Sequence, residues 1–238
     1  TGLGKQLLRI LVGKLLYLTS KKGMQPQKLL GYCGFLRKFL GNARLEAIEQ
    51  LESERIVALR FDTMEGKRTL YIEFFTKGNA IFCDENDIIL SPLDTKVWTD
   101  RTIKKGEKYI YPRLQVNLFD LNKGGYDSLI ANTTQTSLVK CLASELGMGG
   151  AYAEEACYRA TVEKNIVPDD LTTGQVDLLF DAINVIVNEK TRAVIVKNKD
   201  GGIKTITPFA LQIHSAQSGL EIEPCETYNG AFDSILTP

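Results

Sequence analysis

The hydrophobic pattern of the first residues predicts a β-hairpin followed by a helix. Two apolar runs, Gln6–Val12 and Leu15–Thr19, are rich in Leu, Ile and Val and flank Gly13-Lys14, which is typical of a tight turn. From Leu29–Leu40 the apolar residues instead follow helical spacing, and Gly41-Asn42 follows as a stop signal. We expect the buried stripe of this helix to consist of Leu29, Cys33, Leu36 and Leu40.

A meander of β-strands is expected next, because short apolar runs are separated by turn signals. The runs are Ala47–Glu49 leading on through Arg55–Phe61, then Leu70–Phe75, then Ala80–Cys83, with turns at Glu65-Gly66 and Lys77-Gly78-Asn79. A short strand around Ile88–Leu90 and a loop marked by Gly and Pro, Asp100–Pro112, close this half of the chain. Its aromatic residues alternate with apolar partners, which favours sheet core over base-stacking surfaces: Phe61, Tyr71, Phe74 and Phe75.

The second half begins with a helical pattern. Asn117–Asn132 lacks regularity, and we interpret it as a linker. Ser137–Leu146 then places four apolar residues on one helical stripe, Leu138, Cys141, Leu142 and Leu146. Gly147-Met148-Gly149-Gly150 interrupts this pattern and Ala151–Ala160 resumes it, so that two helices joined by a glycine turn predict helix-hairpin-helix geometry.

The remaining pattern returns to strands and completes the predicted fold. Gly174–Asn188 is another amphipathic helix, and the runs Ala193–Val196 and Ile203–Phe209 flank a strong hairpin signal at Asn198–Gly202. These elements predict an α+β protein with two domains, a β-rich one over 1–118 and a helical one over 119–238 with a return β-hairpin near 193–209.

Composition places the chain among globular proteins. Hydrophobic residues make up 44% of the 238 residues and charged residues 24%, which argues against rods, collagen and bulk disorder. The longest apolar stretch, Leu7–Leu18, is interrupted by Arg9, Gly13 and Lys14, so the sequence predicts no membrane span. The chain opens Thr1-Gly2-Leu3-Gly4, without Met or a secretion signal, so we expect a piece of a longer protein.

Charge is balanced overall but strongly asymmetric along the chain. Residues 1–45, called here the basic segment, carry nine basic side chains and no acidic one, whereas residues 46–238 carry 20 basic and 29 acidic ones. A local field of this kind attracts phosphate even on a neutral molecule. The alternative is a solvated basic face, and in the last helical turn Arg37 and Lys38 also suit the helix dipole.

Cysteine and histidine usage gives no sign of a disulfide framework, a metal site or nucleophilic catalysis. The five cysteines are far apart without a C-x-x-C pair, and His214 is the only histidine. We expect no metal, no cofactor and a reducing cytoplasmic location.

Two short stretches could carry nucleic-acid chemistry. Glu54-Arg55 lies at the start of a strand. The arginine could bind a phosphate or stack on a base, and the glutamate could accept a hydrogen bond from a ribose hydroxyl. Both residues could equally be surface charges. The backbone N–H groups of Gly147, Gly149 and Gly150 could approach a phosphate at a helix N-terminus. The following Glu154 and Glu155 would repel a phosphate or simply favour that helix end, so this turn is open to either interpretation.

Collinear motifs over nearly the whole chain resemble one family. They are Gly34–Leu40, Ala43–Leu45, Gln50, Glu54–Val57, Leu70–Phe75, Gly78–Ile81, Asp84, Arg101, Gly106, Tyr109, Pro112, Leu146-Gly147, Ala153–Ala156, Arg159-Ala160, Pro208–Leu211 and Tyr228–Asp233. This pattern is similar to the NFACT family, which includes the fibronectin-binding protein A-like proteins and the ribosome quality-control tailing factors. The resemblance implies a first domain folded like the amino-terminal domain of formamidopyrimidine-DNA glycosylases, followed by a helix-hairpin-helix module.

The resemblance also implies partners and site residues. It implies a factor that binds the large ribosomal subunit with a stalled peptidyl-tRNA and recruits tRNA for untemplated tailing, with no active site of its own and no small-molecule substrate. Glu54 and Arg55 match an Asp-Arg pair needed for tRNA work, and Phe39 stands where many relatives have His. The candidate RNA-binding residues are Arg37, Lys38, Arg44, Glu54, Arg55, Asn79 and Arg101, with Gly147, Gly149 and Gly150 in the helix-hairpin-helix module.

Two other functions remain open from the sequence. The glycosylase-like fold invites a nucleic-acid-binding or DNA-repair protein, although that chemistry uses an amino-terminal proline and none precedes Pro26. The family name invites a fibronectin-binding adhesin, against which the unpaired cysteines favour the cytoplasm.

Overall fold

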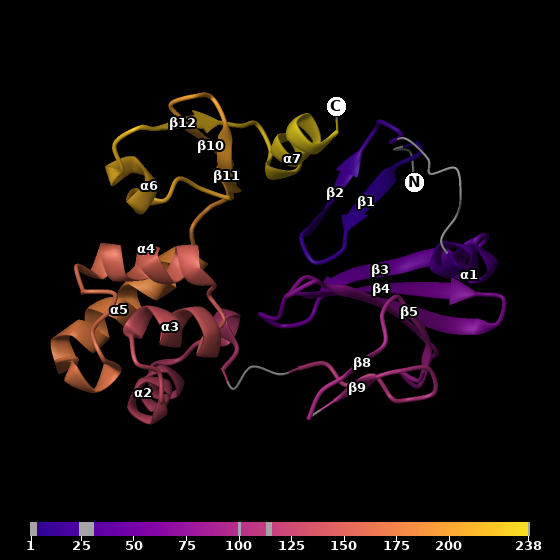
Figure 1. The fold of residues 1–238 in the computed structure, drawn as a ribbon, viewed down its shortest axis with the longest axis horizontal. Helices are drawn as coiled ribbons and strands as arrows, with labels where there is room; N and C mark the ends of the chain where they lie inside the picture. Colours follow the sequence, from indigo (N-terminus) through magenta and orange to yellow (C-terminus); the bar gives the residue numbers. More distant parts are fainter. Residues whose placement is uncertain (1–3, 24–30, 100, 113–115, 238) are drawn as a thin grey trace. The chain divides into compact units, whose positions relative to one another are not determined.

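The computed structural model describes residues 4–23, 31–99, 101–112 and 116–237. The chain divides into two compact units, Thr1–Arg113 and Leu114–Pro238, each of which has its own core (Figure 1). The sequence pattern placed this boundary at residue 118, five residues further on. No helix in the described ranges is long and apolar enough to cross a membrane.

The first unit is built on a five-stranded antiparallel meander. Its strands follow chain order: β3 (Arg44–Gln50), β4 (Ile56–Thr63), β5 (Gly66–Glu73), β6 (Asn79–Cys83) and β7 (Ile89–Pro92). The expected meander is confirmed, but one detail is wrong. The run from Ala47 through Phe61 is two strands, because the chain reverses over 51–55 and pairs Gln50 with Val57.

One face of this sheet packs on a hairpin and a helix. The hairpin consists of β1 (Leu7–Leu11) and β2 (Leu15–Thr19), as the pattern predicted, and the helix is α1 (Gly31–Leu40). The residues of α1 that pack on the sheet are Tyr32, Phe35, Leu36, Phe39 and Leu40, whereas Cys33 is exposed and Leu29 lies outside the described residues. The predicted stripe was therefore wrong at Cys33, because aromatic rings bury more apolar area than a cysteine does. The ring centroids of Phe35 and Phe39 each lie 5.8 Å from that of Phe82.

Two glycines hold the hairpin against the sheet by direct backbone contact. Gly13 in the β1–β2 turn and Gly78 in the β5–β6 turn both have positive φ, +77° and +72°. A Cβ atom on Gly78 would lie 2.1 Å from the backbone nitrogen of Gly13, which no side chain tolerates. Glycine at both turn signals is thus required by packing as well as by turn geometry.

The other face of the sheet is covered by the chain from β7 onward. Residues Ile56, Ala58, Tyr71, Ile81 and Cys83 pack there against Ile89, Ile103 and Tyr109. The stretch Asp100–Pro112 was expected to be a loop, yet it contains β9 (Thr102–Ile103), which pairs with β8 (Lys96–Val97). Residue 100 itself lies outside the described residues.

The second unit is helical around its own core. Its helical elements are η1 (Leu118–Asp120), α2 (Lys123–Asn132), α3 (Leu138–Lys140), the π-helical turn η2 (Cys141–Glu145), α4 (Gly150–Ala160), η3 (Pro168–Asp170) and α5 (Thr173–Val187). The predicted stripe Leu138, Cys141, Leu142 and Leu146 is confirmed, since each is fully buried. The predicted linker over Asn117–Asn132 is wrong, because Asn122 caps α2 by accepting from the Gly125 N–H and α2 buries Tyr126, Leu129 and Ile130.

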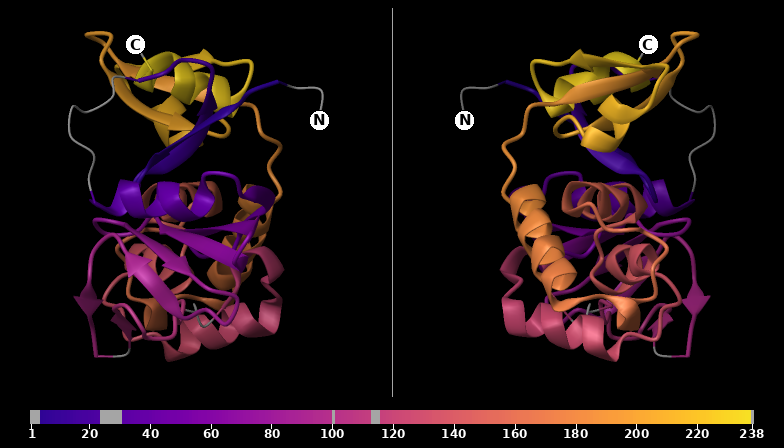
Figure 2. Two further views of the ribbon diagram at one scale, coloured as in Figure 1. Left: turned by 90° about the vertical axis from the view of Figure 1, so that its right-hand side faces the viewer. Right: turned by 90° about the vertical axis from the view of Figure 1, so that its left-hand side faces the viewer.

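A small three-stranded sheet completes this unit. The predicted hairpin is confirmed as β10 (Val194–Asn198) and β11 (Ile203–Thr207), and β10 also pairs with β12 (Leu220–Pro224). Two short helices, α6 (Gln212–Ala216) and α7 (Tyr228–Leu236), belong to the same part of the chain (Figure 2). Sequence patterns missed β12 and both helices because they are short.

Candidate functional site

The Glu54-Arg55 pair lies in the tight turn between β3 and β4. The Glu54 N–H donates to the Leu51 carbonyl at 3.1 Å, the Gln50 side chain donates to the Glu54 carbonyl at 3.1 Å, and the Phe74 N–H donates to the Arg55 carbonyl at 2.8 Å. These bonds hold both residues in fixed positions at the end of β4. As the extended backbone predicts, the two side chains separate: Glu54 is buried and Arg55 is exposed.

Arg55 presents its guanidinium to solvent. Among the described residues no side chain forms an ion pair with it, although carboxylates engage arginines elsewhere in this unit, as at Arg44, Arg60 and Arg101. An unpaired guanidinium on a braced backbone can bind a phosphate in a bidentate manner or stack on a base without first breaking an internal contact.

Three further predicted cations lie at the opposite end of the same strands. Arg37 and Lys38 are exposed in the last turn of α1, where they help to line a hollow of about 230 Å³. Arg44 begins β3 and forms exposed ion pairs with Glu46 at 3.1 Å and Asp62 at 3.5 Å. Because Arg44 pairs with Asp62 in the β3–β4 ladder, seven residues beyond Arg55, the two groups lie about 23 Å apart along the strands. The structure therefore does not bring the predicted residues into one site.

Two predicted contact residues are held by partners within the first unit. Asn79 is fully buried: its amide donates to the Asp94 carbonyl at 2.8 Å and accepts from the N–H groups of Ala80 at 2.9 Å and Asp94 at 3.0 Å. Arg101 is nearly buried and forms an ion pair with Glu73 at 3.0 Å. Long-range partners that a single sequence does not reveal occupy both side chains, which favours structural roles; contact of either residue with RNA stays a prediction.

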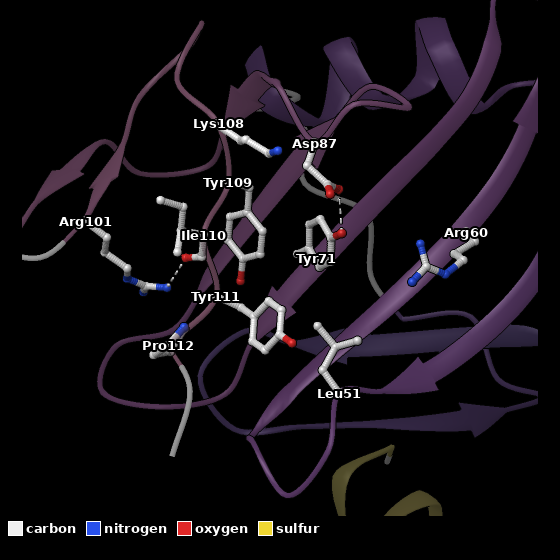
Figure 3. Close-up of a pocket in the computed structure, with 10 residues that line it drawn as sticks. All are labelled: Leu51, Arg60, Tyr71, Asp87, Arg101, Lys108, Tyr109, Ile110, Tyr111 and Pro112. Atoms are coloured by element: carbon white, nitrogen blue, oxygen red, sulfur yellow. Dashed lines mark hydrogen bonds between the residues drawn. The ribbon is translucent and has the colours of Figure 1, made fainter. Parts of the chain in front are cut away.

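One face of the sheet carries a pocket that the sequence did not predict, and Leu51 of the β3–β4 turn lines it. It has a volume of about 680 Å³, and Figure 3 shows the ten residues that line it. They come from the β3–β4 turn, β4, β5, the β6–β7 turn, the residue before β9 and the segment after β9. Tyr71, Tyr109 and Tyr111 supply aromatic surface, while Arg60, Arg101 and Lys108 supply positive charge. Strand alternation places Arg60 on the same face as Ala58 and Tyr71, and that was the available signal.

Hydrogen bonds to carboxylates fix the two buried tyrosines of this pocket. The Tyr71 hydroxyl donates to Asp87 Oδ1 at 2.7 Å and the Tyr109 hydroxyl donates to Glu73 Oε1 at 3.1 Å. The two rings stack with centroids 4.2 Å apart. Burial, joined by the neighbouring carboxylates, raises the pKa of both phenols, so both remain neutral donors near pH 7.

The glycine turn of the second unit follows the π-helical turn η2 and leads directly into α4. Gly147 and Gly149 adopt positive φ, +77° and +75°, and α4 begins at Gly150. Glu155, which raised the concern of phosphate repulsion, is fully buried and points away from any solvent ligand. Its carboxylate accepts from Arg159 Nε at 2.7 Å and from the N–H groups of Gln212 and Ile213 at 3.0 and 3.1 Å. The Glu154 carboxylate is exposed and paired with Lys164 at 2.8 Å.

Side chains suited to hold a metal do not gather in the part of the chain that the structure describes, where no group of three or more His, Cys, Asp or Glu residues has the necessary proximity. The cavities described above contain phenols, guanidiniums and ammonium groups, each cavity with one carboxylate, Asp87 in the larger and Glu65 in the smaller. Their chemistry suits recognition of an anion or a planar ring.

Comparison with known proteins assigns the family. Residues 4–236 match the family of NFACT N-terminal and middle domains, and the chain therefore belongs to the NFACT family. The archaeal Rqc2 homolog aRqcH of Methanocaldococcus jannaschii is 32% identical over 208 residues, which are 83% of this chain and 31% of that protein. The ribosome quality control complex subunit 2 of Saccharomyces cerevisiae is 32% identical over 133 residues, or 56% of this chain and 12% of that protein.

Solved structures share the mixed α and β fold. The fibrinogen-binding protein of Staphylococcus aureus aligns over 98% of this chain and 84% of its own with a TM-score of 0.72, and the N-terminal part of the fibronectin/fibrinogen-binding protein of Streptococcus suis over 99% and 84% with a TM-score of 0.69. Both are 19% identical to this chain, so they establish the fold alone. The chain spans less than a third of the curated relatives it matches.

Proposed function

We propose that this chain is an RNA-binding part of a ribosome quality-control factor. It would bind the large ribosomal subunit carrying a stalled peptidyl-tRNA and recruit tRNA for untemplated extension of the nascent chain. Membership of the NFACT family supports this proposal, together with the names of the archaeal and yeast relatives. Chemistry would take place on the ribosome, and the chain itself would supply binding rather than an active site.

The observation that carries the proposal is the exposed and braced Arg55. Its position matches the family pair needed for tRNA work, its backbone is held by the Phe74 N–H, and its guanidinium faces solvent. Glu54 beside it is buried, so we assign it a supporting role in the turn rather than direct contact with RNA. Arg37, Lys38 and Arg44 form a second basic area that would contact the phosphate backbone about 23 Å away.

In the second unit, we propose that the turn at Gly147 and Gly149 with α4 acts as a helix-hairpin-helix element. Positive φ at both glycines keeps side chains away from the N-terminus of α4, where backbone N–H groups can meet a phosphate. The inward orientation of Glu155 removes one negative charge from that surface.

The test is binding of the 238-residue chain to tRNA and to purified large ribosomal subunits across a salt series. We expect saturable binding that weakens as salt rises, because Lys and Arg displace counterions from the nucleic acid. The absence of binding at low salt, or affinity that does not respond to salt, would contradict the proposal.

A further inference from the structure

The pocket that Leu51 and Tyr71 line has the properties of a small-ligand site. Its volume of about 680 Å³ falls within the usual range of roughly 300 to 1,000 Å³ for such sites. Its walls come from Leu51, Tyr71 and the segment 108–112, so residues far apart in the sequence converge on it (Figure 3). Hydrogen bonds from Tyr71 to Asp87 and from Tyr109 to Glu73 set the wall before any ligand arrives.

Positive charge in this pocket is only partly neutralised. Arg60 uses Nε to donate to Glu49 at 2.7 Å, which orients the guanidinium, and its two Nη groups have no partner among the described residues. Figure 3 shows this guanidinium directed toward the Tyr71 ring. Lys108 is exposed at the opposite rim and forms no ion pair with the described residues. Two cations with available donors favour an anionic ligand.

The aromatic and acidic groups restrict the ligand further. Tyr111 is half-buried and is the most accessible ring of the pocket, because Tyr71 and Tyr109 are each only 5% exposed. Asp87 Oδ1 accepts from Tyr71, while Oδ2 has no partner among the described residues and can accept from an amino group. A ligand that matches all three features is planar, carries an N–H donor at its edge and has a phosphate nearby.

We propose that this pocket takes one unstacked nucleobase of a bound RNA, with the base on Tyr111, its amino group toward Asp87 and the two flanking phosphates on Arg60 and Lys108. The inference rests on the proposed function, since it specifies how the first unit engages tRNA. Arg55 would then hold the RNA backbone at the turn while the pocket holds the base.

The test uses the 238-residue chain, tRNA and free mononucleotides. The control for Arg60→Gln is Lys67→Gln, because both cations lie on the same face of the sheet and pair with a glutamate of β3, at Glu49 and Glu46, but Lys67 does not line the pocket. We expect Tyr111→Leu and Arg60→Gln each to weaken tRNA binding about tenfold, as loss of a stacked base or a phosphate contact does, and Lys67→Gln to change it less than twofold.

Free nucleotides separate the pocket from the rest of the interface. The ring centre of the single tryptophan, Trp98, lies 4.6 Å from the guanidinium of Arg101, which lines the pocket, so we expect its fluorescence to report binding. We expect saturable quenching by AMP, GMP and CMP, weaker quenching by UMP, which lacks an amino group, and none of these responses in Tyr111→Leu. Thermal melts of every variant establish that the fold is retained.

The outcomes distinguish the two proposals. If wild type and both pocket variants bind tRNA equally, the pocket inference is overturned and the proposed function stands. If wild type does not bind tRNA, the proposed function fails, and the pocket inference is then judged by AMP alone. Quenching of Trp98 fluorescence by AMP that is lost in Tyr111→Leu supports a nucleotide site, and the absence of quenching in wild type overturns it. Should Tyr111→Leu fail to fold, the tRNA affinities of Arg60→Gln and Lys67→Gln test the pocket inference by themselves, and equal affinities overturn it.

Discussion

The guanidinium of Arg101 lies 3.0 Å from Glu73 Oε1, and both side chains are almost wholly removed from solvent. The Tyr109 hydroxyl donates to the same carboxylate oxygen, and Arg101 also lies 4.6 Å from the centre of the Trp98 ring. This arrangement ties the segment after β8 to the end of β5. It explains why Arg101 matters to the fold, although its place in the family motifs indicated contact with RNA.

We expect Arg101→Met to destabilise the first unit by about 3 to 5 kcal/mol, because it leaves the Glu73 carboxylate buried without its counter-charge. The double change Arg101→Met with Glu73→Leu should recover much of that loss, since it removes both buried charges. Urea unfolding of the two variants measures the difference. A single variant with wild-type stability but weakened tRNA binding would instead restore Arg101 to the RNA-binding site.

Arg55→Ala should leave the fold unchanged and weaken tRNA binding. An exposed side chain of this kind changes the free energy of unfolding by less than about 0.5 kcal/mol, whereas a charge-assisted contact contributes about 1.5 to 3 kcal/mol, or more than tenfold in affinity. The control is Arg192→Ala, another exposed arginine that forms no ion pair in the described residues. Equal tRNA affinities for the two variants, with unchanged melting temperatures, would remove Arg55 from the site.

The glycine turn offers a matched pair of substitutions. Gly149 has φ +75° and ψ 160°, a conformation that only glycine adopts readily, and nothing lies within 4 Å of an added Cβ. Gly149→Ala should therefore cost about 1 to 3 kcal/mol through backbone strain alone. Gly150→Ala, one residue later in the first turn of α4, should be neutral or stabilising by up to about 1 kcal/mol. Thermal unfolding measures the stability of both variants. Equal stability of Gly149→Ala and Gly150→Ala would contradict the assigned turn geometry.

Local patterns predicted the elements of this fold better than its site. The hairpins, the α3 to α4 glycine turn and the Leu138, Cys141, Leu142 and Leu146 stripe follow from periodicity and turn residues within one stretch of chain. Burial of Asn79 and Arg101 depends on Asp94 and Glu73, which are 15 and 28 residues away. The pocket of Tyr71, Arg60 and Tyr111 depends on long-range packing in the same way, and no single motif contains it.

Cysteine reactivity should separate into two groups. Cys33 is exposed and should react first with a thiol reagent, followed by the half-buried Cys225. Burial raises the pKa of Cys141 and Cys157 to about 11, and that of Cys83 further, so these thiols are both inaccessible and protonated at pH 8. Titration with a chromogenic disulfide should give two fast equivalents in the native state and five after unfolding. Rapid modification of Cys83 without denaturant would contradict the packing of the first unit.

His214 should make the second unit less stable in mild acid. The side chain is 7% exposed, and its Nδ1 has no hydrogen-bond partner among the described residues. Desolvation, reinforced by Lys204 and opposed by Glu155, lowers the pKa of His214 from its ordinary value of 6.5. The unfolded chain therefore binds a proton near pH 6.5 that the folded chain does not yet bind. Stability is full above that pH and falls as the pH decreases toward the folded pKa.

The experiment is urea unfolding of wild type, His214→Leu and Lys204→Met between pH 7.5 and 5.5. Wild-type stability should fall with decreasing pH by no more than about 1.4 kcal/mol per pH unit from this one group, the limit for a single proton. His214→Leu should have the shallowest dependence, and Lys204→Met an intermediate one because removal of that lysine raises the folded pKa of His214. The window lies above the range in which ordinary carboxylates titrate, so Asp and Glu contribute little to the slope. A wild-type slope that survives unchanged in His214→Leu would show that another group controls this acid sensitivity.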